Sequence, residues 1–290
     1  PQIAGWAQVA DAVHARGGRI FMQLMHTGRV AHVANLPEGA EVLGPTGDVC
    51  PGQMYTDSLK RQPHSTPRAM TLTDIRHAVE EYAAAAKHAI QAGFDGVELH
   101  AANGYLIEQF LNPNINHRAD RYGETILGRN RFALEIARAT SAVIGPDRVG
   151  IRISPHGTFN WTGTFPEVTA QYAALLREIS HVGLAYVHLV DHWGAEGFDV
   201  PDGLRQVIRS VFSGTLILSG AYDRGRAYGD LALGKGDLIA LGRPFIANPD
   251  LVGRFARRAD LNQPDPTTFY TPGPQGYTDY PTLDLVARFN

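Results

Sequence analysis

The sequence contains a single cysteine, Cys50, among its 290 residues. One thiol excludes an intrachain disulfide framework and any iron–sulfur cluster that is held by cysteines alone. The chain also lacks an apolar run of the ~18 or more residues that a membrane span needs. Its 26 Lys and Arg face 29 Asp and Glu, and no basic stripe stands out, so nucleic acid is not an expected partner. We expect a cytoplasmic protein that binds neither membrane nor nucleic acid.

Hydrophobic residues make up 44% of the chain, which suffices for the core of one large α/β domain. The opening residues, PQIAGWAQVADAV, have the period of an amphipathic helix and not the composition of a secretory signal. Further along, helical periods alternate with short apolar runs that are typical of buried strands. The six predicted strands read RIFMQL, DGVEL, VGIRIS, YVHLV, LILSG and DLIALG. This alternation predicts a parallel sheet with right-handed crossovers.

A TIM (β/α)8 barrel needs eight strand–helix units of about 30 residues each. The chain opens at a helix and leaves no room for two strands before RIFMQL, so we expect about six of those units. Residues 1–290 are therefore predicted to form a single barrel domain that is short at its N-terminus. Its two exposed sheet edges leave three arrangements open: a longer natural chain, two chains that cover each other's edges, or an arc that folds alone. Of these we favour a homo-oligomer.

Two segments fall outside the strand–helix alternation. Residues 30–68 are rich in Pro and Gly and are too long for an ordinary connection, so we expect a lid over a site, with a disordered insertion as the alternative. Residues 262–290 form a tail with neither a helical nor a strand period. Within the alternation, residues 71–92 give the clearest helix, for which Thr73 is the predicted N-cap and Asp74 lies in the first turn.

The most informative stretch is GFDGVELHAANGYLIEQF, residues 93–110. A short buried strand is followed by His100, Asn103 and Tyr105 and then by an apolar helix from Leu106, which is how a parallel α/β enzyme presents catalytic groups. His100 and Asn103 are three residues apart, so we expect one helical turn to aim both at the same point. Two neutral hydrogen-bonding groups there suit an electronegative oxygen of a ligand. Tyr105 offers a weakly acidic hydroxyl proton.

Polar residues also stand at the ends of other predicted strands, where barrel active sites lie. Gln23 can satisfy backbone groups at the barrel mouth, or its amide can pair with the donors and acceptors of a heterocycle. Arg152 lies in an apolar strand, so its charge needs a partner, either a structural carboxylate or an anionic ligand.

The last two predicted strands end in Ser219 with Gly220 and in Gly242 with Arg243. The glycines can be ordinary turns. An arginine beside a glycine, with a helix start soon after at residues 248–250, favours a site where backbone N–H groups bind a phosphate.

Six longer motifs carry these residues in one order along the chain: QLMHTGR, HAANGYLIEQFLNP, HRADRYGE, GIRISP, SGAY and LGRPFIANPDL. Together they resemble the Old Yellow Enzyme family of flavin-dependent ene-reductases. The resemblance runs from residue 1 to the GYTDYP segment near the C-terminus, and so covers nearly the whole chain. It implies FMN bound on the carboxyl face of an eight-stranded barrel, NAD(P)H as the reductant, and no metal.

The resemblance implies a role for each polar residue at a strand end. It places Gln23 at the pyrimidine edge of the flavin and Arg152 beside the flavin N1 and C2 oxygen, where a cation stabilises the anionic reduced flavin. The other cofactor contacts that it implies, mainly around the phosphate, come from Ser219, Gly220, Gly242 and Arg243.

The implied reaction is the reduction of a C=C bond that a carbonyl or nitro group activates. His100 and Asn103 match the pair that holds the carbonyl or nitro oxygen while hydride reaches the β-carbon. Tyr105 matches the donor that protonates the α-carbon, and Tyr270 matches an aromatic residue that closes over the substrate. A nicotinamide cofactor visits the same pocket, so the implied kinetics are ping-pong.

The chain departs from the family pattern in two places. Met25 replaces the Trp of many relatives, and the two strands that open the barrel in relatives, with a Thr or Cys that tunes the flavin, have no counterpart. A flavin-free, non-catalytic barrel that binds a small ligand or partner therefore stays open as the alternative. An aldolase-like barrel would need a Schiff-base lysine at a strand end, but the lysines stand at loop or helix positions: Lys60, Lys87 and Lys235.

Overall fold

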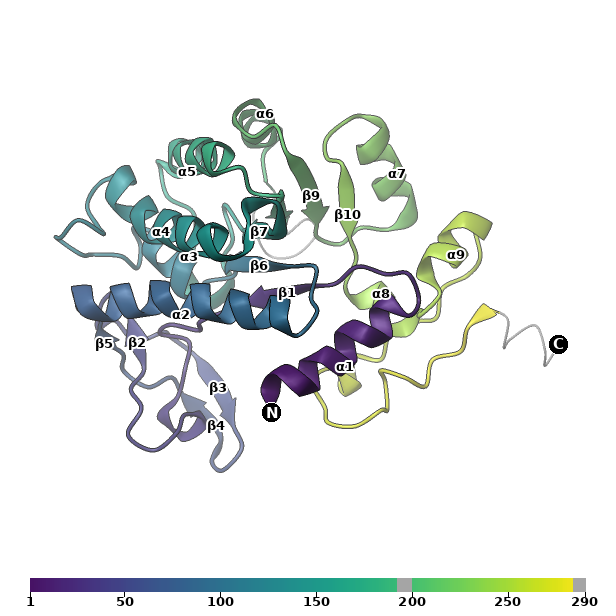
Figure 1. Ribbon diagram of the computed structural model, residues 1–290, viewed down its shortest axis with the longest axis horizontal. Helices are drawn as coiled ribbons and strands as arrows, with labels where there is room; N and C mark the ends of the chain where they lie inside the picture. The colour runs from purple at the N-terminus through teal and green to yellow at the C-terminus, as the bar shows by residue number, and fades with distance from the viewer. Residues whose placement is uncertain (192–199, 284–290) are drawn as a thin grey trace. The chain divides into compact units, whose positions relative to one another are not determined.

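The computed structural model describes residues 1–191 and 200–283. The chain falls into two compact units, Pro1–Leu218 and Ser219–Asn290. The first unit is built on parallel strands that lie side by side in chain order (Figure 1). The strands are β1 (Phe21–Leu24), β6 (Gly96–Ala101), β7 (Val149–Ile153), β8 (Tyr186–Val190) and β9 (Thr215–Ser219). The register of β1, β6, β7 and β8 is parallel throughout, as the sequence predicts.

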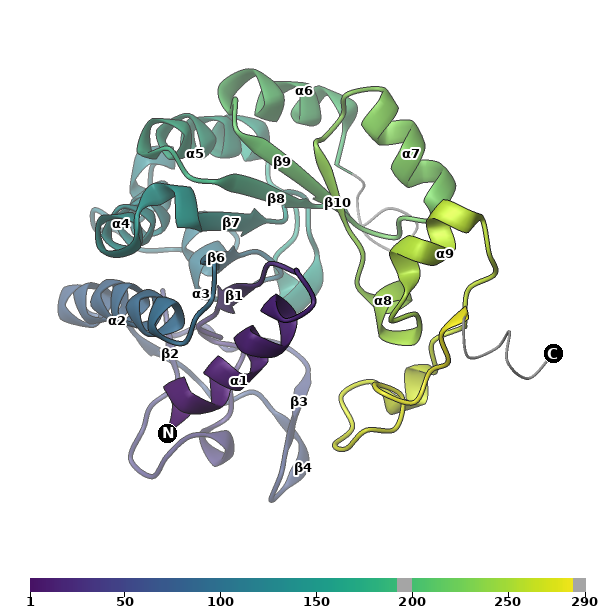
Figure 2. The ribbon, with the colours of Figure 1, turned by 45° about the vertical axis from the view of Figure 1, so that its right-hand side comes forward.

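Helices cover the outer side of this sheet, and Figure 2 shows α2, α4, α5 and α6 along it. The helices of the first unit are α1 (Gln2–His14), α2 (Leu72–Gln91), α3 (Leu106–Leu111), α4 (Ile126–Ile144), α5 (Val168–Val182) and α6 (Asp202–Val211). The longest helix, α2, buries an apolar stripe that recurs every three or four residues from Ile75 to Ala89. In the ranges that the structure describes, no helix is both long and apolar enough to cross a membrane.

Strand β6 is buried along its whole length. A parallel strand that is covered on both faces is normally a continuous apolar run, because a polar side chain there loses its water. Glu98 and His100 break that rule on β6. Two ionisable groups inside a parallel sheet require compensation, and they mark the interior of the sheet as a candidate site.

The start of α2 differs from the prediction by two residues. Thr71, and not Thr73, is the N-cap: its hydroxyl accepts the Asp74 N–H at 3.2 Å, and the Asp74 carboxylate accepts the Thr71 N–H at 2.7 Å. This reciprocal pair is a capping box. Arg68 adds an ion pair to the same carboxylate at 2.8 Å. The predicted cap was wrong because Thr73 lies inside the first turn, where its backbone is already helical.

The segment 30–68 contains regular structure that the prediction of a loop missed. Strands β3 (Gln53–Thr56) and β4 (Lys60–Pro63) form an antiparallel hairpin, and β2 (Leu43–Gly44) pairs in parallel with β5 (Arg68–Ala69). A short 3₁₀ helix, Val33–Asn35, precedes them. Strands of two to four residues give too few repeats for a period to show in the sequence. The disordered alternative for this segment is therefore wrong.

The second unit holds α7 (Arg224–Ala232), β10 (Leu238–Ala240), α8 (Arg243–Ala247) and α9 (Leu251–Arg257). The helix that we expected to start at residues 248–250 is α9, and the short helix α8 precedes it. Buried Asn248 separates them: its amide donates to Pro244 O and Asn262 O, and its side-chain oxygen accepts the Asn262 N–H. In residues 262–283 the only regular element is a 3₁₀ turn, Pro266–Thr268, in line with the predicted lack of period in the tail.

Replacing Thr71 by alanine should lower the free energy of unfolding by about 1 kcal/mol, because it removes the side-chain half of the capping box. Thr73→Ala is the matched control and should change stability by less than about 0.5 kcal/mol. Urea denaturation followed by circular dichroism measures both. Equal losses from the two variants would contradict the assignment of the cap.

Candidate functional site

His100, Arg152 and His188 form a row across three adjacent strands. Their register partners are His100 with Arg152 between β6 and β7, and Arg152 with His188 between β7 and β8. Residues that pair directly in a parallel sheet point to the same face. Each side chain has a buried nitrogen without a hydrogen-bond partner in the part of the chain that the structure describes: His100 Nδ1, Arg152 Nε and His188 Nε2. Such orphan atoms are rare, and a row of three indicates a place that a ligand completes.

Glu98 lies on the same face of β6, two residues before His100. Its Oε1 accepts a hydrogen bond from Gln23 Nε2 at 2.7 Å, and its Oε2 accepts one from His188 Nδ1 at 2.9 Å. A carboxylate only accepts, so Nδ1 of His188 carries the proton. Burial alone would raise the pKa of Glu98, but these hydrogen bonds and the charges of His188 and Arg152 outweigh it and lower the pKa. Glu98 is thus an anion that fixes the Gln23 amide and the His188 ring.

Arg152 is half-buried and forms no ion pair with any residue that the structure describes. Glu98 is near enough to act on it electrostatically, but both Glu98 oxygens already serve Gln23 and His188. Burial lowers the pKa of Arg152, and the charge of Glu98 only partly offsets this. Of the two predicted partners for Arg152, a structural carboxylate and an anionic ligand, the geometry favours the ligand.

His100 is 3% exposed, and its ring lies 5.2 Å from the ring of Tyr105, measured between centroids. Burial and the positive charge of Arg152 lower the pKa of His100 to about 4. The ring is therefore neutral near pH 7 and can hold a neutral oxygen without bringing in a second cation.

The turn that joins β6 to α3 places Asn103 and Tyr105. Asn103 and Gly104 both have positive φ angles, 58° and 74°, and Tyr105 is the N-cap residue of α3. His100 lies inside the strand, so the expectation that it shares a helical turn with Asn103 was wrong. A left-handed turn at Asn103 and Gly104, and not a helix, follows the strand that carries His100. Asparagine and glycine are the residues that adopt such a backbone most readily.

The other predicted contacts lie in the second unit. Gly220 follows β9 with a φ angle of 123°, which favours glycine, and its carbonyl oxygen accepts a hydrogen bond from Arg226. Gly242 is the N-cap residue of α8, and Arg243 is the first residue of that helix, with an exposed side chain. Tyr270 is 98% exposed, and its backbone N–H donates to the Tyr277 hydroxyl at 2.7 Å.

Sequence reasoning missed Glu98 and His188 in the first unit. Both were open to detection, because side chains of a strand that are two apart share a face. Glu98 is two before His100 in the predicted strand DGVEL and its continuation, and His188 is the one histidine in the apolar run YVHLV. Glu98 and His188 lie within their strands, whereas the predicted site residues are those near the strand ends.

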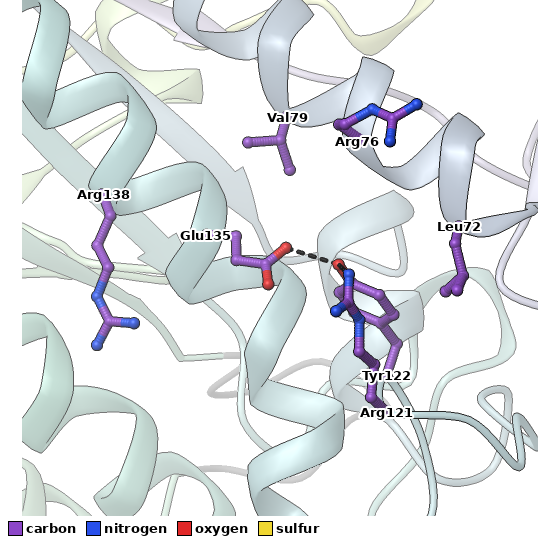
Figure 3. Close-up of a pocket in the computed structure, with 7 residues that line it drawn as sticks. All are labelled: Leu72, Arg76, Val79, Arg121, Tyr122, Glu135 and Arg138. Carbon is purple, nitrogen blue, oxygen red and sulfur yellow. Dashed lines mark hydrogen bonds between the residues drawn. The ribbon is translucent and has the colours of Figure 1, made fainter.

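Two concave surfaces of the first unit lie outside this row. A cavity of about 490 Å³ lies between α2 and α4. Figure 3 shows the residues that line it, among them Tyr122, whose hydroxyl donates to Glu135. None of the predicted site residues lines it. A second cavity, of about 320 Å³, lies between the end of β1 and α2, and Gln23 is among the residues that line it.

Three comparisons place the chain among known proteins. The model of the NADH:flavin oxidoreductase / NADH oxidase family matches residues 1–262. A probable flavin mononucleotide-dependent alkene reductase of Leishmania infantum is 40% identical over 287 residues, which cover 97% of this chain and 77% of the relative.

Solved structures agree with the sequence comparisons. Morphinone reductase superimposes on this chain with a TM-score of 0.93 at 44% identity. The match covers 98% of this chain and 77% of morphinone reductase. The complex of morphinone reductase with tetrahydroNAD superimposes with a TM-score of 0.91. The Old Yellow Enzyme homologue of Zymomonas mobilis gives a TM-score of 0.90 at 35% identity, over 97% of this chain and 78% of its own.

The buried His100 ring should make stability depend on pH. Between pH 6.5 and about 4 the unfolded chain binds a proton at His100 that the folded chain does not, so the free energy of unfolding falls as the pH falls through this window. At pH 5 this single group should cost about 2 kcal/mol relative to pH 7. The variant His100→Gln should remove that part of the decline.

Denaturation of the FMN-free chain at pH 5 and pH 7 measures this effect. His77→Gln, which changes an exposed histidine on α2, is the control and should decline as the wild type does. A decline in His100→Gln as steep as that of the wild type would contradict a buried, neutral His100.

Proposed function

Because this chain belongs to the NADH:flavin oxidoreductase / NADH oxidase family, we propose which of its residues carry out the reaction of that family. The chain is an FMN-dependent ene-reductase of the Old Yellow Enzyme type, with NAD(P)H as its reductant. Its fold is a TIM barrel, to which it contributes about six strand–helix units. Its substrates are alkenes that are activated by a carbonyl or nitro group, and no observation favours a flavin-free barrel.

The residue assignments rest mainly on one observation. His100 of β6, Arg152 of β7 and His188 of β8 each have a buried nitrogen without a hydrogen-bond partner among the residues that the structure describes. The flavin ring of FMN supplies the hydride when it is bound, and its edge is lined with nitrogen and oxygen atoms that accept hydrogen bonds. Arg152 would hold that edge with a guanidinium that lacks a protein carboxylate. Gln23 would hold the pyrimidine part through an amide whose direction is set by its hydrogen bond to Glu98.

His100 and Asn103 bind the carbonyl or nitro oxygen of the substrate. The low pKa of His100 keeps its ring neutral, so its N–H group donates a hydrogen bond without an additional charge. Asn103 lies in the left-handed turn that follows the strand, and its amide would donate to the same oxygen. Hydrogen bonds to this oxygen stabilise the negative charge that develops there, and removing one such donor typically lowers the rate by about 10²–10³.

Tyr105 donates the proton that completes the reduction at the α-carbon. Its position directly after the Asn103–Gly104 turn and its contact with the His100 ring support this role. For closure over the substrate we propose the segment 30–68, which is held as a folded body by its hairpin, and the aromatic ring of Tyr270, which is free to move because it is almost fully exposed.

For the remaining cofactor contacts, mainly with the phosphate, we propose Ser219, Gly220, Gly242 and Arg243. The φ angle of Gly220 and the exposed guanidinium of Arg243 support their use for an anion. A cytoplasmic location suits an enzyme that draws on NAD(P)H and carries a single buried thiol, Cys50. The exposed edge strand β1 favours association with a second copy of the chain.

Reconstitution with FMN tests the function directly. The purified chain should acquire visible flavin absorbance and oxidise NADPH or NADH when cyclohexenone is supplied. Arg152→Met should weaken FMN binding at least about tenfold, because it removes a charge-assisted contact. A wild-type chain that stays colourless after reconstitution would overturn the proposal.

Tyr105→Phe separates the two halves of the reaction. It should suppress reduction of cyclohexenone by about 10² or more, because the α-carbon loses its acid. Anaerobic bleaching of the flavin by NADPH should continue almost unchanged, since that step needs no proton from Tyr105. Stopped-flow absorbance measures both steps, and equal loss of the two would show that Tyr105 is not the donor.

A further inference from the structure

The Asn103–Gly104 turn is hydrogen-bonded to a buried carboxylate, that of Glu108, which has no role in the proposed reaction. Glu108 lies on α3, a helix whose six residues are all buried, and only 2% of Glu108 is exposed. Its Oε2 accepts the backbone N–H of Gly104 at 2.6 Å. The Ser154 hydroxyl lies 2.9 Å from both carboxylate oxygens, and the Tyr172 hydroxyl donates to Oε1 at 3.3 Å.

Ser154 extends this network to the second residue of the turn. It directly follows β7, and its oxygen accepts the backbone N–H of Asn103 at 2.8 Å. That oxygen accepts from Asn103, so its own proton is free to point to Glu108. The two successive N–H groups of the left-handed turn are therefore both bound, one by Glu108 directly and one through Ser154.

The carbonyl groups of the turn are held as well. Asn160 Nδ2 donates to Asn103 O, and Gln109 Nε2 donates to Gly104 O, both at 2.8 Å. The turn also packs tightly, because a Cβ atom on Gly104 would lie 2.6 Å from Phe159 O. A backbone with two positive φ angles in a row persists only where its surroundings determine it. Of the groups that do so, only Glu108 can bring a charge.

We propose that Glu108 is a positioning residue for substrate binding: through Gly104 and Ser154 it holds the turn that aims Asn103 at the substrate oxygen beside His100. The proposal rests on the proposed function, since it needs Asn103 to bind the substrate. It assigns Glu108 no contact with substrate or flavin. It also ties the turn after β6 to the end of β7, the strand that carries Arg152, and to α5 through Tyr172.

The chemistry of the site explains why a carboxylate stands there. Glu108 faces three donors: the Gly104 N–H and the hydroxyls of Ser154 and Tyr172. Burial raises the pKa of Glu108 to about 7 in spite of these hydrogen bonds. A glutamine has the same shape, and its NH₂ group can donate to the hydroxyl oxygens of Ser154 and Tyr172, but it carries no charge. The hydrogen bond from the Gly104 N–H is then no longer charge-assisted, so the turn is held less tightly while the packing stays intact.

The test compares two affinities in the reconstituted holoenzyme. In Glu108→Gln we expect the Kd of cyclohexenone for the oxidised enzyme, followed by the flavin difference spectrum, to rise about tenfold or more, and kcat/KM to fall by up to about 10², mainly through KM. The Kd of FMN, measured by fluorescence quenching, should stay within about twofold, because Gln23 and Arg152 do not contact Glu108. A role in the fold alone would weaken both affinities together.

Two further variants grade the effect. Ser154→Ala removes the hydrogen bond from the Asn103 N–H and a donor to Glu108 but leaves the bond between Gly104 and Glu108, and it should also raise the Kd of cyclohexenone. Tyr172→Phe, which loses the longest hydrogen bond, should raise it least. If Glu108→Gln fails to fold, these two variants decide the question by the same comparison of affinities. Glu135→Gln is the control: it changes a carboxylate on α4 that accepts from Tyr122, and it should leave both affinities unchanged.

The outcomes separate this proposal from the one on which it rests. An active wild type whose Glu108, Ser154 and Tyr172 variants bind cyclohexenone as the wild type does would overturn the positioning role alone. Parallel losses of FMN and cyclohexenone affinity would also overturn it. A wild-type chain that binds no FMN would overturn the proposed function, and the positioning role with it.

Discussion

A buried carboxylate holds the polar interior of the sheet together. Glu98 lies on β6, where every residue is buried, and it joins Gln23 of β1 to His188 of β8 by two hydrogen bonds. A lone carboxylate there would lose several kcal/mol of hydration. Its two donors and the nearby charge of Arg152 offset that loss. The directions of Gln23 and His188, and the charge balance of Arg152, all depend on this one group.

Glu108 shows the opposite solution to the same problem. Both carboxylates are buried, yet the pKa of Glu98 is lowered while that of Glu108 is raised to about 7. The difference lies in the neighbours, since Glu98 accepts a hydrogen bond from His188 and also has the guanidinium of Arg152 close by, whereas Glu108 has only the neutral donors of Gly104, Ser154 and Tyr172. Glu98 is thus held as an anion beside His188 and Arg152, whereas Glu108 supports the Asn103–Gly104 turn through its hydrogen bonds.

The order of strands and helices followed from the sequence because long helices and apolar strands repeat their pattern often enough to be seen. The predictions were wrong or incomplete for features that depend on one or two residues or on contacts between distant parts of the chain. Thr71 and Thr73 both suit an N-cap, and only the backbone decides between them. His100 and Asn103 were grouped for a wrong reason, since a left-handed turn and not a helix joins them. His188 was missed because it lies within its strand. The residue that it pairs with, Arg152, is on another strand, far away in the sequence.

The hydrogen bond between the Gly104 N–H and Glu108 bears on how the protein ages. In an Asn-Gly pair the glycine nitrogen can attack the asparagine side-chain carbonyl, and the chain slowly converts to aspartate or isoaspartate. Asn103–Gly104 is such a pair, but its nitrogen is committed to a carboxylate inside a rigid turn. The bond that holds this turn should therefore also slow the conversion of Asn103, so the shape of the turn and the chemical lifetime of its asparagine depend on the same contact.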